Sequence, residues 1–184
     1  MKKVLVLSSV VIVVLMGVSI ANAQTLLSAL DDDPKIIYFN PDIYPDIEEI
    51  KEPTNQAFFD AVSNQSGKFR KAKVLKAETP LSYEEVDTTT IVEYCKNNDA
   101  DFAVVPKVKY FKVGIGKYVF SNQVIVSMKF FDSKGNLITE TDYDTYRKNM
   151  RMLGSTTNSI KIGTAGAMKD LMKNIRKIKT ADTL

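Results

Sequence analysis

The sequence predicts an α/β (α+β) chain with a single mixed β-sheet of about five strands and helices packed against it. In some short segments apolar residues recur at every second position, which is typical of strands. In others they recur at every third or fourth position, as on one side of a helix. The segments follow one another as strand, helix, strand, helix, three strands and helix. The two early strand–helix–strand units favour parallel pairing, and the three later strands favour an antiparallel meander.

The N-terminus has the layout of a secretory signal peptide. Lys2 and Lys3 precede an apolar segment, Val4–Ile20, and Ala21-Asn22-Ala23 places small residues where a signal peptidase cuts. We expect cleavage after Ala23, export to the bacterial periplasm or exterior, and no stable membrane insertion afterwards. An uncleaved membrane anchor is the alternative, because the apolar segment approaches the ~18 residues that a spanning helix needs. The expected organisation is a signal peptide at 1–23, a flexible lead-in at 24–35 and a single α/β domain at 36–184.

The composition excludes several classes of function. The 184 residues include no histidine and one cysteine, Cys95, which we expect to be a small buried side chain. The commonest general base and metal ligand is therefore absent, and no Ser–His or Cys–His pair can form. Cleavage at Ala23 would remove two of the 25 basic residues and none of the 22 acidic ones, leaving a net charge of about +1. We expect no cofactor, no metal site, no catalytic residue and no nucleic-acid partner.

The first half of the domain is expected to contain two strand–helix units. Lys35–Asn40 predicts a strand, and residues 41–53, with three prolines, predict a long exposed loop with at most one helical turn. Thr54 is expected to cap a helix that reaches Gln65. Residues 69–77 predict the next strand. The capping-box spacing of Ser82-Tyr83-Glu84-Glu85 predicts a helix toward Asn98, or two helices with the second capped at Asp87.

The second half is expected to contain the meander. Phe102–Val105 is apolar on both faces, and this strand is expected to continue to a turn at Gly114-Ile115-Gly116. A long hairpin follows, with its turn at 132–136 and its second strand from Leu137 to Arg147. The last helix is expected to face the core with one apolar stripe. The stripe comprises Ile160, Thr164, Ala167, Met168, Leu171, Ile175 and Ile178, and the lysines lying off it are Lys161, Lys169, Lys173 and Lys177.

Three acidic residues in the hairpin are a candidate site. Glu140, Asp142 and Asp144 alternate, so on a strand they share one face. They could form a calcium site or a glycosidase-like carboxylate pair, which leaves a periplasmic hydrolase or ligand-binding protein as the alternative function. The favoured interpretation is a solvated face opposite Lys107 and Lys109 on a neighbouring strand.

Tyr44 and the lysines of the last helix are candidates for binding a partner. Tyr44 lies among prolines in the predicted loop, and exposed aromatic residues often anchor contacts. Lys169, Lys173 and Lys177 could hold a nucleic acid or an anionic lipid head group. A solvated helix face is the favoured interpretation, because no aromatic residues are interleaved with these lysines. Gly163-Thr164-Ala165-Gly166 lacks the spacing of a phosphate-binding loop and fits close helix packing better.

Several short motifs resemble one superfamily of bacterial envelope proteins. They are Ala57-Phe58-Phe59-Asp60-Ala61 in a helix, Gly67-Lys68-Phe69 before a strand, Asn98-Asp99-Ala100-Asp101-Phe102 between helix and strand, and Phe131-Asp132-Ser133-Lys134-Gly135-Asn136-Leu137 in a hairpin. The resemblance is to the superfamily that contains the TolB amino-terminal domain, CsgG and LpoB. It implies an exported, non-catalytic envelope protein that acts as a protein-interaction or assembly module with an envelope protein partner. The partner and the oligomeric state stay open.

Overall fold

The structure is a computed structural model that describes residues 33–67, 72–111, 114–115, 118–119, 123–149 and 155–181. The expected signal peptide, 1–23, and most of the expected lead-in lie outside these ranges. The strands are β1 (Lys35–Asn40), β2 (Asp42–Tyr44), β3 (Lys73–Pro80), β4 (Phe102–Phe111), β5 (Gly114–Ile115), β6 (Tyr118–Val119), β7 (Gln123–Asp132) and β8 (Leu137–Asp144). The helices are α2 (Glu48–Ser66), α3 (Thr88–Asn98), α4 (Thr145–Asn149) and α5 (Thr156–Ala181).

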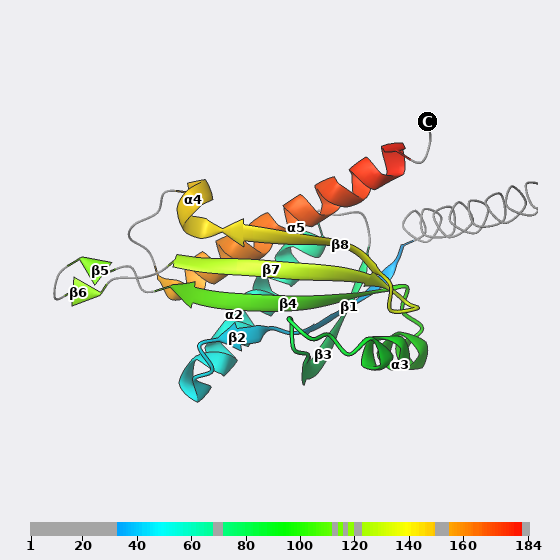
Figure 1. Ribbon diagram of the computed structural model, residues 1–184, viewed down its shortest axis with the longest axis horizontal. Coiled ribbons are helices and arrows are strands. Elements are labelled where there is room, and N and C mark those ends of the chain that lie inside the picture. The colour runs from blue at the N-terminus through cyan, green and yellow to red at the C-terminus, as the bar shows by residue number, and fades with distance from the viewer. Residues whose placement is uncertain are drawn as a thin grey trace, which may run out of the picture.

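The predicted fold class is confirmed. One mixed six-stranded sheet has the order β3-β1-β4-β7-β8, and β2 pairs with β4 beside β1. β1 pairs in parallel with both β3 and β4, whereas β4, β7 and β8 form an antiparallel meander. β5 and β6 form a separate two-stranded ribbon, which projects beyond one end of the sheet in Figure 1. Early parallel units followed by a meander are what the order of segments in the sequence predicts.

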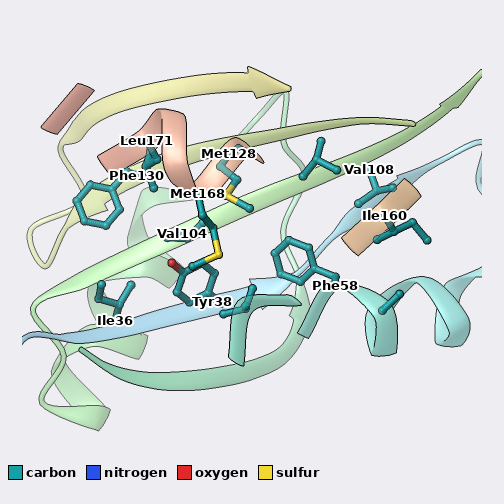
Figure 2. Packing of buried hydrophobic residues seen from close by; sticks show 14 of the residues in the cluster. Ile36, Tyr38, Phe58, Val104, Val108, Met128, Phe130, Ile160, Met168 and Leu171 are labelled. Carbon is teal, nitrogen blue, oxygen red and sulfur yellow. The ribbon is translucent and has the colours of Figure 1, made fainter. Parts of the chain in front are cut away.

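One face of the sheet is closed by α2 and α5, which lie behind the strands in Figure 1. Figure 2 shows the core beneath them, where Phe58 of α2 and Met168 of α5 meet alternate residues of the central strands. Val104, Val108, Met128 and Phe130 are all 1% exposed or less. The predicted stripe of α5 is confirmed, because all of its residues are buried except the half-buried Ile178.

Among the described residues, α3 covers one end of the other face, and the segment 81–87 covers part of the surface beside it. Ile91 and Cys95 of α3 pack with Ile37, Phe39 and further residues of the adjoining strands. The prediction that Cys95 is a buried small side chain is confirmed, since it is 1% exposed. Burial raises the pKa of its thiol to about 11, so the reactive thiolate is scarce at neutral pH.

The prediction of a long exposed loop at 41–53 is wrong. Asp42–Tyr44 forms β2, and α2 begins at Glu48 rather than after Thr54. Pro41 and Pro45 flank β2 rather than interrupt it, and Pro53 lies inside α2, whose positive N-terminal end is stabilised by Glu48 and Glu49. Thr54 donates its hydroxyl hydrogen bond to the Ile50 carbonyl, 2.5 Å away, instead of capping the helix.

The predicted helix starting at Ser82 does not form, whereas the one capped at Asp87 does. The Ser82 hydroxyl accepts a hydrogen bond from the Glu85 N–H at 3.3 Å, but the chain from 81 to 87 stays irregular. The Asp87 carboxylate accepts from the Thr89 N–H at 3.0 Å and opens α3. A capping-box spacing thus produced a local turn, because the apolar side chains after Ser82 turn toward the sheet.

The hairpin is confirmed apart from its end. Its turn is held by Asp132, whose Oδ1 accepts from the N–H groups of Lys134 and Asn136, and Gly135 has φ +80°. The predicted second strand to Arg147 is too long, because β8 ends at Asp144 and α4 follows. In the turn predicted at Gly114-Ile115-Gly116, the first two residues form β5 and pair with β6, and Gly116 lies outside the described residues.

The predicted strand Lys35–Asn40 is confirmed as β1, so the flexible lead-in, which was expected to reach residue 35, ends before it. Pro34 is also buried, with its carbonyl accepting from the Lys73 N–H at 2.9 Å. Residues 69–71 of the predicted second strand lie outside the described residues, and β3 extends to Pro80. Among the described helices, none combines the length and apolar character needed to cross a bilayer.

Candidate functional site

The half of the sheet face that α3 does not cover carries the polar residues of the central strands. β4 places Val105 under α3 and then turns Lys107 and Lys109 to the same side, where their cross-strand neighbours are Ser127 and Ile125. We call this surface the open face, comprising Tyr44, Lys107, Lys109, Ile125, Ser127, Asp142 and Asp144. A change from apolar to charged side chains along one strand thus marks where helix cover ends.

One row of the open face runs across four strands. Tyr44 of β2 is paired with Lys109, Lys109 with Ile125, and Ile125 with Asp144. Tyr44 is 56% exposed, and the Lys109 ammonium lies 5.7 Å from the centre of its ring. Tyr146, which follows Asp144 on α4, is 44% exposed. The row therefore joins two exposed aromatic rings through a cation, an aliphatic side chain and a carboxylate.

The next row comprises Asp42, Lys107, Ser127 and Asp142 and is partly covered by the segment 81–87. Tyr83 is 8% exposed, with the ammonium groups of Lys129 and Lys107 at 4.5 and 5.8 Å from its ring centre. Its N–H donates to Asp42 at 3.0 Å, and its carbonyl accepts from Lys129 Nζ at 2.7 Å. Burial and the nearby carboxylates of Asp142 and Glu140 raise the pKa of Tyr83, so its hydroxyl stays protonated. These contacts fix the segment to the sheet and bound the open face on that side.

The three alternating carboxylates share the face but have different roles. Glu140 and Asp142 are exposed. Asp144 Oδ1 accepts from the N–H groups of Tyr146 and Arg147 at 2.9 and 3.2 Å, which caps α4, and from Gln123 Nε2 at 3.1 Å. Within the described ranges, no group of three or more His, Cys, Asp and Glu side chains is arranged to hold a metal ion. The predicted lysine neighbours also differ, because Lys129 lies directly opposite Glu140 and Ser127 separates Lys107 from Asp142.

A shallow depression of about 720 Å³ occupies one end of the open face. Its lining includes Ile125, Asp142, Asp144 and Tyr146, with Gln123, Arg147 and Lys148 completing it. The depression is open rather than enclosed, and its lining mixes one aromatic and one aliphatic side chain with charged and amide groups.

The structure separates Tyr44 from the lysines of the last helix. Tyr44 belongs to the open face, whereas α5 packs on the opposite, closed face. Lys169, Lys173 and Lys177 are all exposed. Lys169 and Lys173 line a groove of about 820 Å³ between α5, α4 and β8, and Lys177 is outside its lining. The four predicted partner-binding residues therefore belong to at least two surfaces.

The glycines of α5 serve close packing, as predicted. A Cβ added at Gly166 would lie 2.2 Å from the ring of Tyr143, and one at Gly163 would lie 2.7 Å from Val126. Both lie inside an uninterrupted helix, so the segment is not a phosphate-binding loop. Tyr38 and Phe39, which lie near Tyr44 in the sequence, are core residues at 4% and 0% exposure.

Tyr146 and Lys129 are site residues that the sequence did not single out. Tyr146 was assigned to a strand, where its exposure could not be inferred, and the helix start after Asp144 is what turns it outward. The signal was present in Asp144-Thr145, an N-cap residue type before a short helix. Lys129 alternates with buried Met128 and Phe130 and could have been placed on the polar face.

Comparison with known proteins gives similarity of fold alone. The PelC dodecamer from Paraburkholderia phytofirmans is similar over 75% of this chain and 86% of that chain, at 12% identity and a TM-score of 0.49. For lipoprotein GNA1162 from Neisseria meningitidis the shares are 76% and 99%, at 10% identity and 0.45. For the LpoB C-terminal domain from Salmonella enterica they are 66% and 93%, at 11% identity and 0.39. No protein-family model and no curated protein sequence matches the chain.

The predicted resemblance is thus met in part. LpoB, one of the proteins named from the sequence motifs, is among the solved structures with a similar fold, but these identities do not establish membership of a family. TM-scores below 0.5 give no argument for function. Function has to be argued from the surfaces of this chain.

Proposed function

We propose that this protein is an exported, non-catalytic module of the bacterial envelope that binds a protein partner through its open face. The row from Tyr44 to Tyr146 is the observation that carries the proposal. It combines two exposed aromatic rings, the kind of side chain that most often anchors interfaces, with a polar surround. The signal-like N-terminus supports export, and the absence of histidine from the whole chain argues against the commonest acid–base and nucleophilic mechanisms.

The proposal is tested by photocrosslinking at single positions in the cells that produce the protein. A photoreactive phenylalanine analogue at Tyr44 or Tyr146 is expected to crosslink to the same envelope protein. Leu137 is the matched control, because it is 50% exposed but lies at the opposite end of β8, beside the hairpin turn. The same crosslink from position 137, or no crosslink from positions 44 and 146, would contradict the proposal.

A charge reversal then tests the centre of the row. Lys109→Glu replaces the ammonium group beside Tyr44 with a carboxylate, in the same row as Asp144. We expect this variant to abolish the crosslink from position 44. Lys134→Glu changes the net charge equally in the exposed hairpin turn and should leave the crosslink intact. Loss with both variants would mean that net charge, and not the open face, governs binding.

A further inference from the structure

β8 (Leu137–Asp144) is an edge strand of the described sheet, and Figure 1 shows it as the outermost strand on one side. The strand at the opposite edge, β3, carries Lys73, Lys76 and Pro80, residue types that commonly keep an edge from pairing with another strand. The sequence of β8 contains neither lysine nor proline. The two edges therefore differ, and β8 has the composition of a strand that can accept a further neighbour.

Two contacts show which backbone groups of β8 point away from β7. The Thr145 hydroxyl accepts from the Val124 N–H at 3.0 Å and donates to the Val124 carbonyl at 2.9 Å, so Val124 turns its backbone toward β8. This direction alternates along antiparallel strands, and Glu140 and Asp142 are opposite β7 residues of the other parity. The Glu140 carbonyl agrees, because it accepts from Asn174 Nδ2 instead of from β7. The N–H and C=O groups of Glu140 and Asp142 thus point outward.

These outward groups are accessible. Glu140 and Asp142 are both exposed. The bond from the Asn174 side chain to the Glu140 carbonyl is 3.4 Å long, beyond the usual range of about 2.7–3.2 Å, so an incoming N–H can replace it. Unpaired groups at a strand edge are what an extended peptide uses when it adds a strand to a sheet.

The side chains of β8 determine which strand fits beside it. On the side of the open face, the carboxylates of Glu140 and Asp142 would lie next to alternate residues of an added strand, and within the described ranges neither carboxylate forms an ion pair. On the other side the neighbours would be buried Thr141 and half-buried Tyr143. A second copy that paired antiparallel through β8 would set carboxylates against carboxylates, which is unfavourable. Basic residues opposite the carboxylates, with threonine or apolar residues between them, match both sides.

We propose that β8 is a docking edge for an extended segment of a protein partner that carries basic residues at alternate positions. The segment adds a strand to the sheet, with its backbone bonded to Glu140 and Asp142 and its Lys or Arg side chains beside their carboxylates. The edge shares Asp142 with the open face but needs neither Tyr44 nor Tyr146. The inference therefore goes beyond the proposed function and does not rest on it.

The test is binding of a fluorescein-labelled peptide of eight residues, the length of β8, to the protein purified in its exported form. In this peptide lysine alternates with threonine and valine. Fluorescence anisotropy in about 0.15 M salt should show saturable binding. A peptide of the same composition with its lysines in one block loses the alternation and should bind about tenfold more weakly.

Backbone methylation separates strand addition from simple charge attraction. N-methyl groups on one set of alternate peptide residues should abolish binding, and those on the other set should not, because only one set directs its N–H groups at β8. The sensitive set is the lysines if the peptide runs antiparallel to β8, and the residues between them if it runs parallel. Equal effects of the two sets would overturn the inference.

Charge reversal on the protein tests the position of the site. Glu140→Lys/Asp142→Lys should weaken binding by about tenfold or more, and Glu140→Gln/Asp142→Asn by a smaller factor. Glu52→Lys/Glu93→Lys changes the net charge equally on exposed residues of α2 and α3 and should change binding by less than about twofold.

The inference is also overturned if the alternating peptide does not bind, or if the two double charge reversals weaken binding equally. Thermal unfolding of each variant separates loss of binding from loss of folding. Because these variants leave Tyr44 and Tyr146 in place and the peptide assay does not use the envelope partner, crosslinking from position 44 of the otherwise unaltered protein remains an independent test of the proposed function.

Discussion

The two faces of the sheet are built from the same strands but have opposite chemistry. In β7, Val124, Val126 and Met128 are fully buried under α2 and α5, whereas Ile125 and Lys129 are half-buried on the other side. The closed face contains most of the hydrophobic core, and the open face contributes little to it beyond the part under α3. Stability and the proposed binding thus depend on alternate residues of the same strand, so substitutions of adjacent residues should have very different effects.

The largest contrast is expected between Met128→Ala and Ile125→Ala. Met128 is 0% exposed, so its truncation leaves a cavity and should lower the free energy of unfolding by about 2–5 kcal/mol. Ile125 is half-buried on the open face, and we expect a loss of less than about 1 kcal/mol. Urea denaturation followed by circular dichroism measures both. Equal losses would show that the open face is covered as completely as the closed one.

A second contrast concerns the contact that defines the floor of the groove. Gly166→Ala forces a methyl group against the ring of Tyr143 and should cost about 1–3 kcal/mol despite the better helix propensity of alanine. Gly67→Ala is the matched control, since nothing lies within 4 Å of its added Cβ and its φ is −62°. We expect that control to be neutral or slightly stabilising in the same denaturation assay.

Secondary structure could be predicted from the sequence where it is determined by residues close together in the chain, and not where it depends on contacts with distant residues. The hairpin at Asp132 and the stripe of α5 were predictable because turn chemistry and helical spacing act over a few residues. Pro53 misled because it was expected to end a loop, whereas α2 begins before it, at Glu48. Ser82 misled because Tyr83 is pulled to the sheet by lysines distant in sequence, Lys107 and Lys129.

The candidate site was predicted less completely than the fold. Tyr44 and Lys169 could each be selected by residue type and surroundings, but only the sheet order shows that they belong to opposite faces. The row from Tyr44 to Asp144 joins residues one hundred positions apart. No periodicity in the sequence encodes that neighbourhood, which arises from β2 pairing beside β1 on β4.

A smaller effect is expected at the end of β8. Asp144→Ala removes the cap of α4 and should lower the free energy of unfolding by about 1 kcal/mol, whereas Asp144→Asn retains an acceptor and should cost less. Glu140→Gln, on the same face without such a bond among the described contacts, should be neutral. If calcium raises the melting temperature of the wild type and this rise is lost in Asp142→Asn, the carboxylates bind metal and the open face has a different function.

The smallest effect is a dependence of stability on acid. Hydrogen bonds to Lys107, Thr90 and Lys35 lower the pKa values of Glu84, Asp87 and Asp99, respectively. Because the unfolded carboxylates, with pKa values near 4, take up protons first, this stability is complete above that range and is lost as the pH falls through it. Lys107→Met removes the main cause at Glu84 and should reduce the loss, as measured by urea midpoints from about pH 6 to 3.

The position of β1 sets a limit on how far the chain can be trimmed from its N-terminal side. β1 lies between β3 and β4 and is hydrogen-bonded to both, while the Pro34 carbonyl accepts from Lys73. In the described sheet β3 and β4 do not pair with each other, and only β1 joins them. Trimming beyond Pro34 that removes β1 would therefore split the sheet into two parts. Maturation after Ala23, or trimming as far as Asp33, leaves every one of these strand pairings in place.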